Sequence, residues 1–455
     1  MRVNFKLLPA FVLLAGSMAG QVQAVPSADE IKQLGVTLTP WGAEKAGNAD
    51  GTIPEYTGGL TKPPANYDPQ RPGWRPDPFP EDKPLVRIDA KNMEQYKERL
   101  SPGTMEMMKK YPDYYINVFQ TRRTAAYPQD VLDNSILNAS RCATQNGDLG
   151  LDTSKGCGFG IPFPIPKNGL EVMWNHEARY RPTYKSLNSV VSYVKPSGEV
   201  VVTARGTNYR EWPLYDKRKQ VPDTFFAFRM EYSGPARLNG MNTLWHDMTA
   251  DSERRNWAYQ PATRRVRLSP DSAADTPISA AGGAMLYDDD QLFSGKKDRF
   301  EWKLVGKREM YIPYNNYRSL YADQGGCTRE KRLATSRFMN PECVRWELHR
   351  VWHVEATLKE GKRHVYAKRD FFFDEDSFSD GIAENYDKSG NLYRISQQIG
   401  APAYDVPSPS ITDNYVIDLI SGIYLTMQSD DGYPVVEPLT PAQLSADFLD
   451  KRIFK

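Results

Sequence analysis

Cysteine, histidine and long apolar runs are scarce in this chain. Its 455 residues include four cysteines and five histidines, and the formal net charge at pH 7 is +1. Beyond residue 24 no stretch approaches the ~20 apolar residues that span a bilayer, so we expect no membrane span in the mature protein. Removing Arg2 and Lys6 with the N-terminal segment leaves 56 of the 58 basic residues against 57 acidic ones. This balance argues against a nucleic-acid-binding or polybasic membrane-binding protein.

The first 24 residues predict an export signal. Arg2 and Lys6 give a basic start, residues 7–19 an apolar core, and the small-residue sequence 22–24 a cleavage site. We therefore expect cleavage near Ala24 and a mature, periplasmic protein that begins near Val25. The residue directly after the cleavage site is not a cysteine, which argues against a lipid-modified N-terminus.

The four cysteines fall into two local pairs, which fits an oxidising compartment. Cys142 lies close to Cys157 in the sequence, and Cys327 lies similarly close to Cys343. Four cysteines allow three connectivities, of which we expect the local one, Cys142 with Cys157 and Cys327 with Cys343. The alternative is a metal site, but neither pair has the short C-x-x-C spacing that zinc sites favour.

Residues 25–85 form a proline-rich arm. Eight prolines lie between Pro63 and Pro84, and proline fixes φ and excludes helix, so we expect an extended segment. It is either a tether or a strap on the body, and its aromatic residues favour docking: Tyr56, Tyr67, Trp74 and Phe79.

Residues 86–186 predict a helical and disulfide-loop region. Segments 92–100 and 105–110 have helical patterns, and between them Ser101 can cap the second helix and Pro102 can start it. A loop rich in glycine and proline, residues 147–169, follows and contains Cys157.

From residue 187 to 455 the pattern is of strands separated by polar turns. Strands are predicted at 189–195, 199–205, 225–232, 238–248, 299–311, 345–358, 363–373 and 391–398. Thr440 can cap a short C-terminal helix that ends near Leu449. The predicted fold is therefore mainly β with flanking helices (α+β), with one large, curved antiparallel sheet in this region.

Residues 254–268, RRNWAYQPATRRVRL, predict a β-hairpin. Trp257 and Tyr259 alternate on one strand, Val266 and Leu268 on the other, and residues 261–263 form the corner. The hairpin resembles the W-x-Y-x-P-x-x-R-R-V motif of the domain-of-unknown-function family 1329. The resemblance continues in residues 293–315, 348–378 and 386–395.

That family is grouped with periplasmic lipoprotein carriers and sensors of the LolA, LolB and MucB type, and its own biochemical activity is not established. The resemblance implies an open half-barrel of the LolA/LolB-like type that cradles an apolar molecule. It also implies partners in envelope export: an outer-membrane barrel protein and an inner-membrane efflux-type transporter.

Many aromatic residues line the predicted strands. A curved sheet that does not close must cover its concave face with a helix or a ligand, so we expect a hydrophobic cavity there. Its candidate lining residues are Phe226, Phe228, Trp245, Trp257, Tyr259, Trp302, Trp352 and Phe372. The alternative is that these aromatics are ordinary core.

Arg265 and Arg267 share one face of their strand, opposite Val266 and Leu268. Arginine pairs bidentately with carboxylates and phosphates, so these two are candidate ligands for a headgroup at the mouth of the cavity. The alternative is a solvated strand face paired with acids such as Asp251 and Glu253.

Catalytic signatures are missing: there is no G-x-S-x-G, no H-E-x-x-H and no dinucleotide-binding glycine motif. His349 and His353 share a strand face and could bind a metal with Glu347 or Glu355. The acidic runs 288–290 and 374–376 could bind calcium, but neither has the spacing of an EF-hand loop. We expect no metal, no cofactor and no enzymatic activity.

The predicted function is a periplasmic carrier or binding protein for a lipid, a lipoprotein or another amphipathic molecule. One alternative is a non-catalytic envelope scaffold that binds a protein partner, which a dry, fully packed sheet interior would favour. A second alternative is an unrecognised lipid or polyester hydrolase, in which a buried histidine and carboxylate would meet a serine or cysteine in a pocket.

Overall fold

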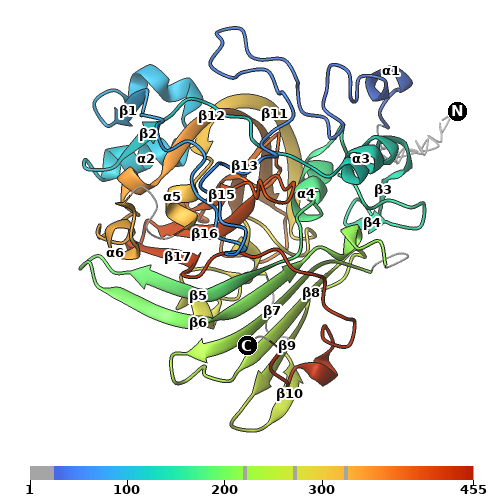
Figure 1. The fold of residues 1–455 in the computed structure, drawn as a ribbon. Coiled ribbons are helices and arrows are strands. Elements are labelled where there is room, and N and C mark those ends of the chain that lie inside the picture. Colours follow the sequence, from blue (N-terminus) through green and yellow to red (C-terminus); the bar gives the residue numbers. More distant parts are fainter. Residues whose placement is uncertain (1–24, 219–222, 270–273, 322–325, 454–455) are drawn as a thin grey trace, which may run out of the picture.

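The computed structural model describes residues 25–218, 223–269, 274–321 and 326–453. The predicted export signal, residues 1–24, lies outside these residues. Within the described ranges, no helix combines the length and apolar character needed to cross a membrane. The chain is mainly β, as the sequence predicts, and helices and loops flank one large sheet (Figure 1).

Fifteen strands form this sheet, in the order β1-β2-β12-β13-β14-β15-β16-β17-β5-β6-β7-β8-β9-β10, with β11 paired to β12 beside this path. All neighbours pair antiparallel except β2 and β12. The path ends at β1 and β10, so the sheet is curved and open. The strands are β1 (Val86–Asp89), β2 (Tyr115–Val118), β5 (Tyr184–Val194), β6 (Val200–Glu211), β7 (Thr224–Gly234), β8 (Asn242–Met248), β9 (Arg255–Gln260), β10 (Arg265–Leu268), β11 (Phe300–Pro313), β12 (Arg345–Leu358), β13 (Lys368–Asp374), β14 (Gly381–Tyr386), β15 (Leu392–Ala401), β16 (Ile411–Asp418) and β17 (Ile423–Ser429).

The strand predictions are confirmed at the level of elements. The predicted strand 345–358 coincides with β12, and the predicted hairpin 254–268 is β9 and β10, with Trp257 opposite Leu268 and Tyr259 opposite Val266. Strands β1, β2, β14, β16 and β17 were not predicted. Every residue of β16 is buried, including polar ones, so this strand lacks the alternation of apolar and polar residues on which strand prediction depends.

Helices are few and short. They are α1 (Ala28–Ile31), α2 (Pro102–Lys110), α3 (Gln129–Arg141), α4 (Gly169–Glu177), α5 (Tyr317–Leu320) and α6 (Arg329–Arg332). The cap of α2 is confirmed, because the Ser101 side chain accepts a hydrogen bond from the Thr104 amide and Pro102 is the first helical residue. The helix predicted at 92–100 is a 3-10 helix, η1 (Met93–Arg99).

The predicted C-terminal helix is wrong. Residues 440–449 contain only a turn that Thr440 caps and a 3-10 helix, η7 (Ala446–Phe448). Backbone carbonyls of this segment accept hydrogen bonds from side chains of the sheet instead. Arg229 on β7 donates to the carbonyl oxygens of Gln443 and Lys451, and Asn242 on β8 donates to that of Leu449. The segment is therefore an irregular strap across β7 and β8.

Both predicted disulfides are present. The Cα atoms of Cys142 and Cys157 are 4.6 Å apart, and those of Cys327 and Cys343 are 5.6 Å apart. The first disulfide ties the end of α3 to the glycine-rich loop, beside a small ladder of β3 (Ala143–Gln145) and β4 (Gly150–Asp152).

The proline-rich arm lies against the body. Trp41 is 1% exposed, and its indole Nε1 donates to the carbonyl oxygen of Glu375. Further along, the buried guanidinium of Arg75 pairs with Asp405 at 2.5 Å and donates to the carbonyl oxygen of Tyr433 at 3.0 Å. Since these contacts are buried and charged, the arm forms part of the folded body.

Candidate functional site

An apolar cavity lies on one face of strands β5 to β8. Phe228 and Trp245, two of the predicted lining residues, face each other there across β7 and β8, with ring centroids 4.8 Å apart. The volume of the cavity is about 50 Å³, which is room for a few water molecules. The residues that line it are Ser189, Val191, Ala204, Asn208, Arg210, Phe228, Met230, Tyr232, Trp245, Ile278, Ala280, Met285, Asp290 and Met427.

A loop of residues 277–286, which we call the covering loop, lies over this cavity. Pro277 and Leu286 form an isolated β-bridge, and the amide of Ile278 donates to the carbonyl oxygen of Met285 at 2.9 Å. Ile278 and Met285 are buried in one cluster with Val191 and other side chains of the sheet. The covering loop therefore packs its own apolar side chains over the cavity.

Three buried polar atoms on the cavity lining have no hydrogen-bond partner among the described residues: the Asn208 Oδ1, the Arg210 Nε and the Trp245 Nε1. A buried polar atom without a partner costs about 1–3 kcal/mol, a cost that a polar group of a ligand could offset. Residues that line the cavity thus carry two unpartnered donors and one unpartnered acceptor next to an apolar wall, which suits a molecule with both characters.

The structure separates the other predicted cavity residues from Phe228 and Trp245. Trp257 lies opposite Leu244 and Leu268, and Tyr259 lies opposite Asn242 and Val266. These pairs occupy the other face of the sheet, where they pack with Leu444 and Leu449 of the C-terminal strap. The pattern of the hairpin alone shows that Trp257 and Tyr259 share a face, but not which face.

The remaining four predicted aromatics belong to packed clusters. Phe226 packs against Trp212, and Phe372 is stacked on His353 in the main core. Trp302 and Trp352 pack at the edge of a third cluster. These four residues therefore lie in packed core, as the alternative interpretation expects.

Arg265 and Arg267 lie on the same face of the sheet as the cavity. Arg267 is opposite Ala258, which is opposite Thr243, which in turn is opposite the cavity residue Met230. Both arginines are exposed. The acids considered as their partners, Asp251 and Glu253, contact Lys296 instead, at 3.3 and 3.8 Å.

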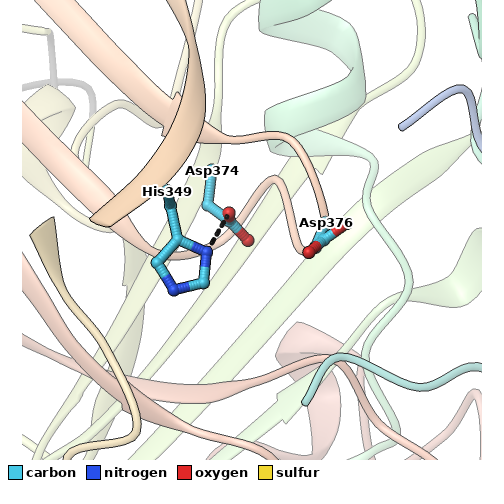
Figure 2. Close-up of side chains that lie close together, drawn as sticks. All are labelled: His349, Asp374 and Asp376. Carbon is cyan, nitrogen blue, oxygen red and sulfur yellow. Dashed lines mark ion pairs between the residues drawn. The ribbon is translucent and has the colours of Figure 1, made fainter. Parts of the chain in front are cut away.

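A second group of functional side chains is buried between β12 and the turn after β13 (Figure 2). His349 Nδ1 lies 3.2 Å from Asp374, and its Nε2 lies 3.2 Å from Glu347. Burial alone would lower the pKa of His349, but the adjacent carboxylates of Asp374 and Glu347 outweigh burial and raise it to about 10. The ring is therefore a buried imidazolium at neutral pH.

Candidate metal ligands meet in this group, because one ligand atom each of His349, Asp374 and Asp376 lies within 4.8 Å of the others. Two separate predictions, a histidine site and an acidic run, thus converge. Cations already compensate the carboxylates: Arg123 holds both oxygens of Asp376 at 2.7 and 2.8 Å, and Arg345 contacts Glu347 at 2.6 Å. A metal ion would have to displace a proton and a guanidinium.

The two histidines of the predicted metal pair have different partners. His353 pairs with Asp370 at 2.8 Å, whereas both ring nitrogens of His349 face carboxylates and the ring stacks on Tyr314 with a centroid distance of 3.9 Å. A hydrolytic dyad needs one ring nitrogen directed at a serine or cysteine. The geometry of His349 is that of a buried ion-pair network.

Comparison with solved structures gives distant similarity. An outer membrane lipoprotein-sorting protein domain from Vibrio parahaemolyticus has a TM-score of 0.42 at 14% identity, covering 62% of this chain and 98% of that chain. A DUF1329 family protein from Desulfovibrio piger has a TM-score of 0.41 at 16% identity, covering 62% and 97%. A LolA superfamily protein from Nitrosomonas europaea has a TM-score of 0.36 at 13% identity, covering 62% and 100%.

Comparison of sequences gives a close relative and a family. The uncharacterized protein PA3922 of Pseudomonas aeruginosa is 38% identical over 433 residues, which cover 94% of this chain and 93% of the relative. The family model described as protein of unknown function (DUF1329) matches residues 87–451. The family resemblance predicted from the hairpin and the later strands is confirmed, and the chain belongs to the DUF1329 family.

Proposed function

We propose that this protein is a periplasmic carrier or binding protein for an amphipathic molecule such as a lipid or the acyl part of a lipoprotein. The apolar part of the ligand enters the cavity between β5–β8 and the covering loop. The observation that carries the proposal is the coincidence of an apolar wall with three unpartnered buried polar atoms, on Asn208, Arg210 and Trp245.

The covering loop must move for such a ligand to enter, because about 50 Å³ does not hold an acyl chain. Displacing the loop exposes Ile278, Ala280 and Met285, which costs roughly 5 kcal/mol at 1.5–3 kcal/mol per large apolar side chain. Burying an acyl chain contributes about 0.8 kcal/mol per CH₂. A chain of about ten CH₂ groups therefore offsets the displacement.

The first test is purification of the native protein from the periplasm, followed by organic extraction and mass spectrometry. A stoichiometric lipid or fatty-acyl species supports the carrier and identifies its cargo. The second test is titration of the delipidated protein with a fluorescent fatty-acyl probe. A protein that purifies empty and also fails to bind the probe contradicts the proposal.

A matched pair of variants locates the binding. Ala204 lines the cavity and is fully buried, so Ala204→Leu fills the space that the probe needs and should weaken its binding at least tenfold. Ala442→Leu adds the same volume at an exposed position of the C-terminal strap and should leave probe affinity unchanged. Equal affinity of both variants would place the probe elsewhere.

The scaffold is the second candidate, and the dense packing in the interior of the sheet favours it. Strands β15 and β16 are buried along almost their whole length by the chain itself. If no amphipathic ligand is found, the interior serves to hold the sheet together and the function belongs to a surface that binds a protein partner.

A further inference from the structure

The β9–β10 hairpin lies at one end of the sheet (Figure 1). Arg255, Arg264, Arg265 and Arg267 are all exposed. Within the described parts of the chain, none of the four makes an ion pair with a carboxylate. The near-neutral charge of the whole chain therefore conceals a local basic patch.

Some other arginines of the chain are paired with acids. Arg87 pairs with Glu342 at 2.6 Å, and Arg318 pairs with Asp77 at 3.2 Å. Arg254, next to the hairpin, is held by both oxygens of Asp247 at 2.6 and 2.9 Å. The hairpin differs in that it brings four exposed arginines without such a partner together, where an anionic group outside the protein can reach them.

Two further features of the hairpin favour a contact with something outside the protein. Arg264 occupies the tip of the turn with φ of +50°, a left-handed conformation that disfavours side chains other than glycine and asparagine. Leu268 is 57% exposed on β10. Charged side chains often protect an edge strand from aggregation, but an exposed leucine on the same edge works against protection.

We propose that this hairpin docks the protein on a membrane surface rich in anionic phospholipids. The arginines bind lipid phosphates through their planar donor groups, and Leu268 enters the apolar boundary beneath them. Because β10 is an edge strand, a hairpin that approaches edge-on presents Arg265 and Arg267 from one face and Leu268 from the other.

The docked membrane would lie near the cavity. Met230, Thr243, Ala258 and Arg267 form one row across β7 to β10, and three steps of ~4.8 Å between strands give about 14 Å from the cavity lining to the hairpin. The docking inference stands on the hairpin alone; only its use for loading or unloading cargo rests on the proposed function.

The test is co-sedimentation of the mature protein with vesicles of phosphatidylglycerol and phosphatidylethanolamine, and with vesicles of phosphatidylcholine alone. We expect binding to the anionic vesicles only, and weaker binding at high salt. Each arginine near such a surface strengthens binding roughly fivefold, so the triple variant Arg264→Glu, Arg265→Glu, Arg267→Glu should bind at least about a hundredfold more weakly.

The matched control reverses three other exposed charges: Lys62→Glu, Lys83→Glu and Lys91→Glu, at positions with no ion pair among the described residues. It should keep vesicle binding. Leu268→Asp should weaken binding to anionic vesicles. Equal loss in the control, equal binding to neutral vesicles, or no sedimentation of the unmodified protein would overturn the docking inference.

The acyl-probe titration separates the two proposals. The hairpin variant should bind the probe in solution like the unmodified protein. Vesicle binding without probe binding would remove the cavity function and leave the docking inference intact. Probe binding without vesicle binding would remove the docking inference and leave the cavity function intact.

Discussion

Phe228 on β7 and Trp245 on β8 are paired across the sheet and line the same cavity, and the buried Nε1 of Trp245 has no hydrogen-bond partner among the described residues. We expect Trp245→Phe to weaken binding of the fatty-acyl probe about fivefold, because a hydrogen bond to the polar end of a ligand is worth about 1 kcal/mol. Titration of probe fluorescence measures the affinity.

Trp257→Phe is the control for this prediction. It is the same chemical change on the neighbouring strand, but on the other face of the sheet, against Leu244 and the C-terminal strap. Affinity for the probe should not change. If both variants lose affinity equally, the loss comes from the stability of the sheet, which urea denaturation of both variants would reveal.

These two tryptophans also show how far the sequence leads. Alternation within the hairpin correctly predicts that Trp257 and Tyr259 share a face, as do Val266 and Leu268. Which face is concave depends on how β8 and β9 pair, and on what covers each side, and neither is encoded within one strand. The covering loop and the C-terminal strap carry no periodic pattern, so the sequence does not predict that they cover opposite faces.

The ion-pair cluster illustrates a second limit. The sequence identifies His349 and the acidic run 374–376 as chemically notable, and these residues do meet. Their meeting results from the register of β12 and β13, in which Val351 lies opposite Asp374. Arg123, which lies far earlier in the chain, completes the cluster, and no local signal in the sequence links it to Asp376.

The raised pKa of His349 predicts a pH-dependent contribution to stability. The group binds its proton more tightly in the folded state, with a pKa of about 10 against 6.5 for the ordinary side chain. Its contribution is therefore complete below pH 6.5 and is lost as the pH rises through about 10. At about 1.4 kcal/mol for each tenfold change in proton affinity, the contribution is at most roughly 5 kcal/mol.

We expect His349→Gln to be less stable than the unmodified protein by several kcal/mol at pH 6, with a difference that shrinks toward pH 10. Urea denaturation at a series of pH values measures this difference. His353→Gln, which removes a partly exposed ring with one carboxylate partner, should have a smaller effect. A difference for His349→Gln that grows with pH would show that the ring is neutral in the folded protein.

Asp380 should behave in the opposite sense. Burial, and then repulsion from Asp374, raises its pKa to about 7. An acid whose pKa is raised by folding destabilises the folded state increasingly as the pH rises from 3.8 to 7. Asp380→Asn should therefore be about as stable as the unmodified protein at pH 4 and more stable by up to roughly 4 kcal/mol at pH 8.

Asparagine keeps the shape of the side chain, and the hydroxyls of Ser377 and Ser410 that now donate to Asp380 can reorient. Asp387→Asn is the control: the backbone amide of Asn391 lowers the pKa of this exposed carboxyl, so its replacement should become less favourable as the pH rises. Stability that falls with pH in Asp380→Asn relative to the unmodified protein would contradict the assignment.

The docking of the proline-rich arm depends on Gly73. Its φ is +82°, and a Cβ atom there would lie 2.1 Å from the backbone nitrogen of Pro434. The Gly73 carbonyl oxygen also accepts a hydrogen bond from the Tyr433 amide at 2.8 Å. Gly73→Ala should therefore lift the arm, with its anchor Arg75, away from the body and destabilise the protein by roughly 2–4 kcal/mol, toward the upper end of single substitutions.

Gly51→Ala is the control for this prediction, because it introduces the backbone strain of a positive φ without the steric clash that alanine meets at Gly73. Gly51 also has a positive φ, +71°, but nothing lies within 4 Å of its Cβ position, so alanine there should cost only about 1–2 kcal/mol. Limited proteolysis then distinguishes the two variants: the arm should become cleavable under native conditions in Gly73→Ala and stay protected in Gly51→Ala. An arm that stays protected in both would mean that Arg75 and Trp41 hold it without the contact at Gly73.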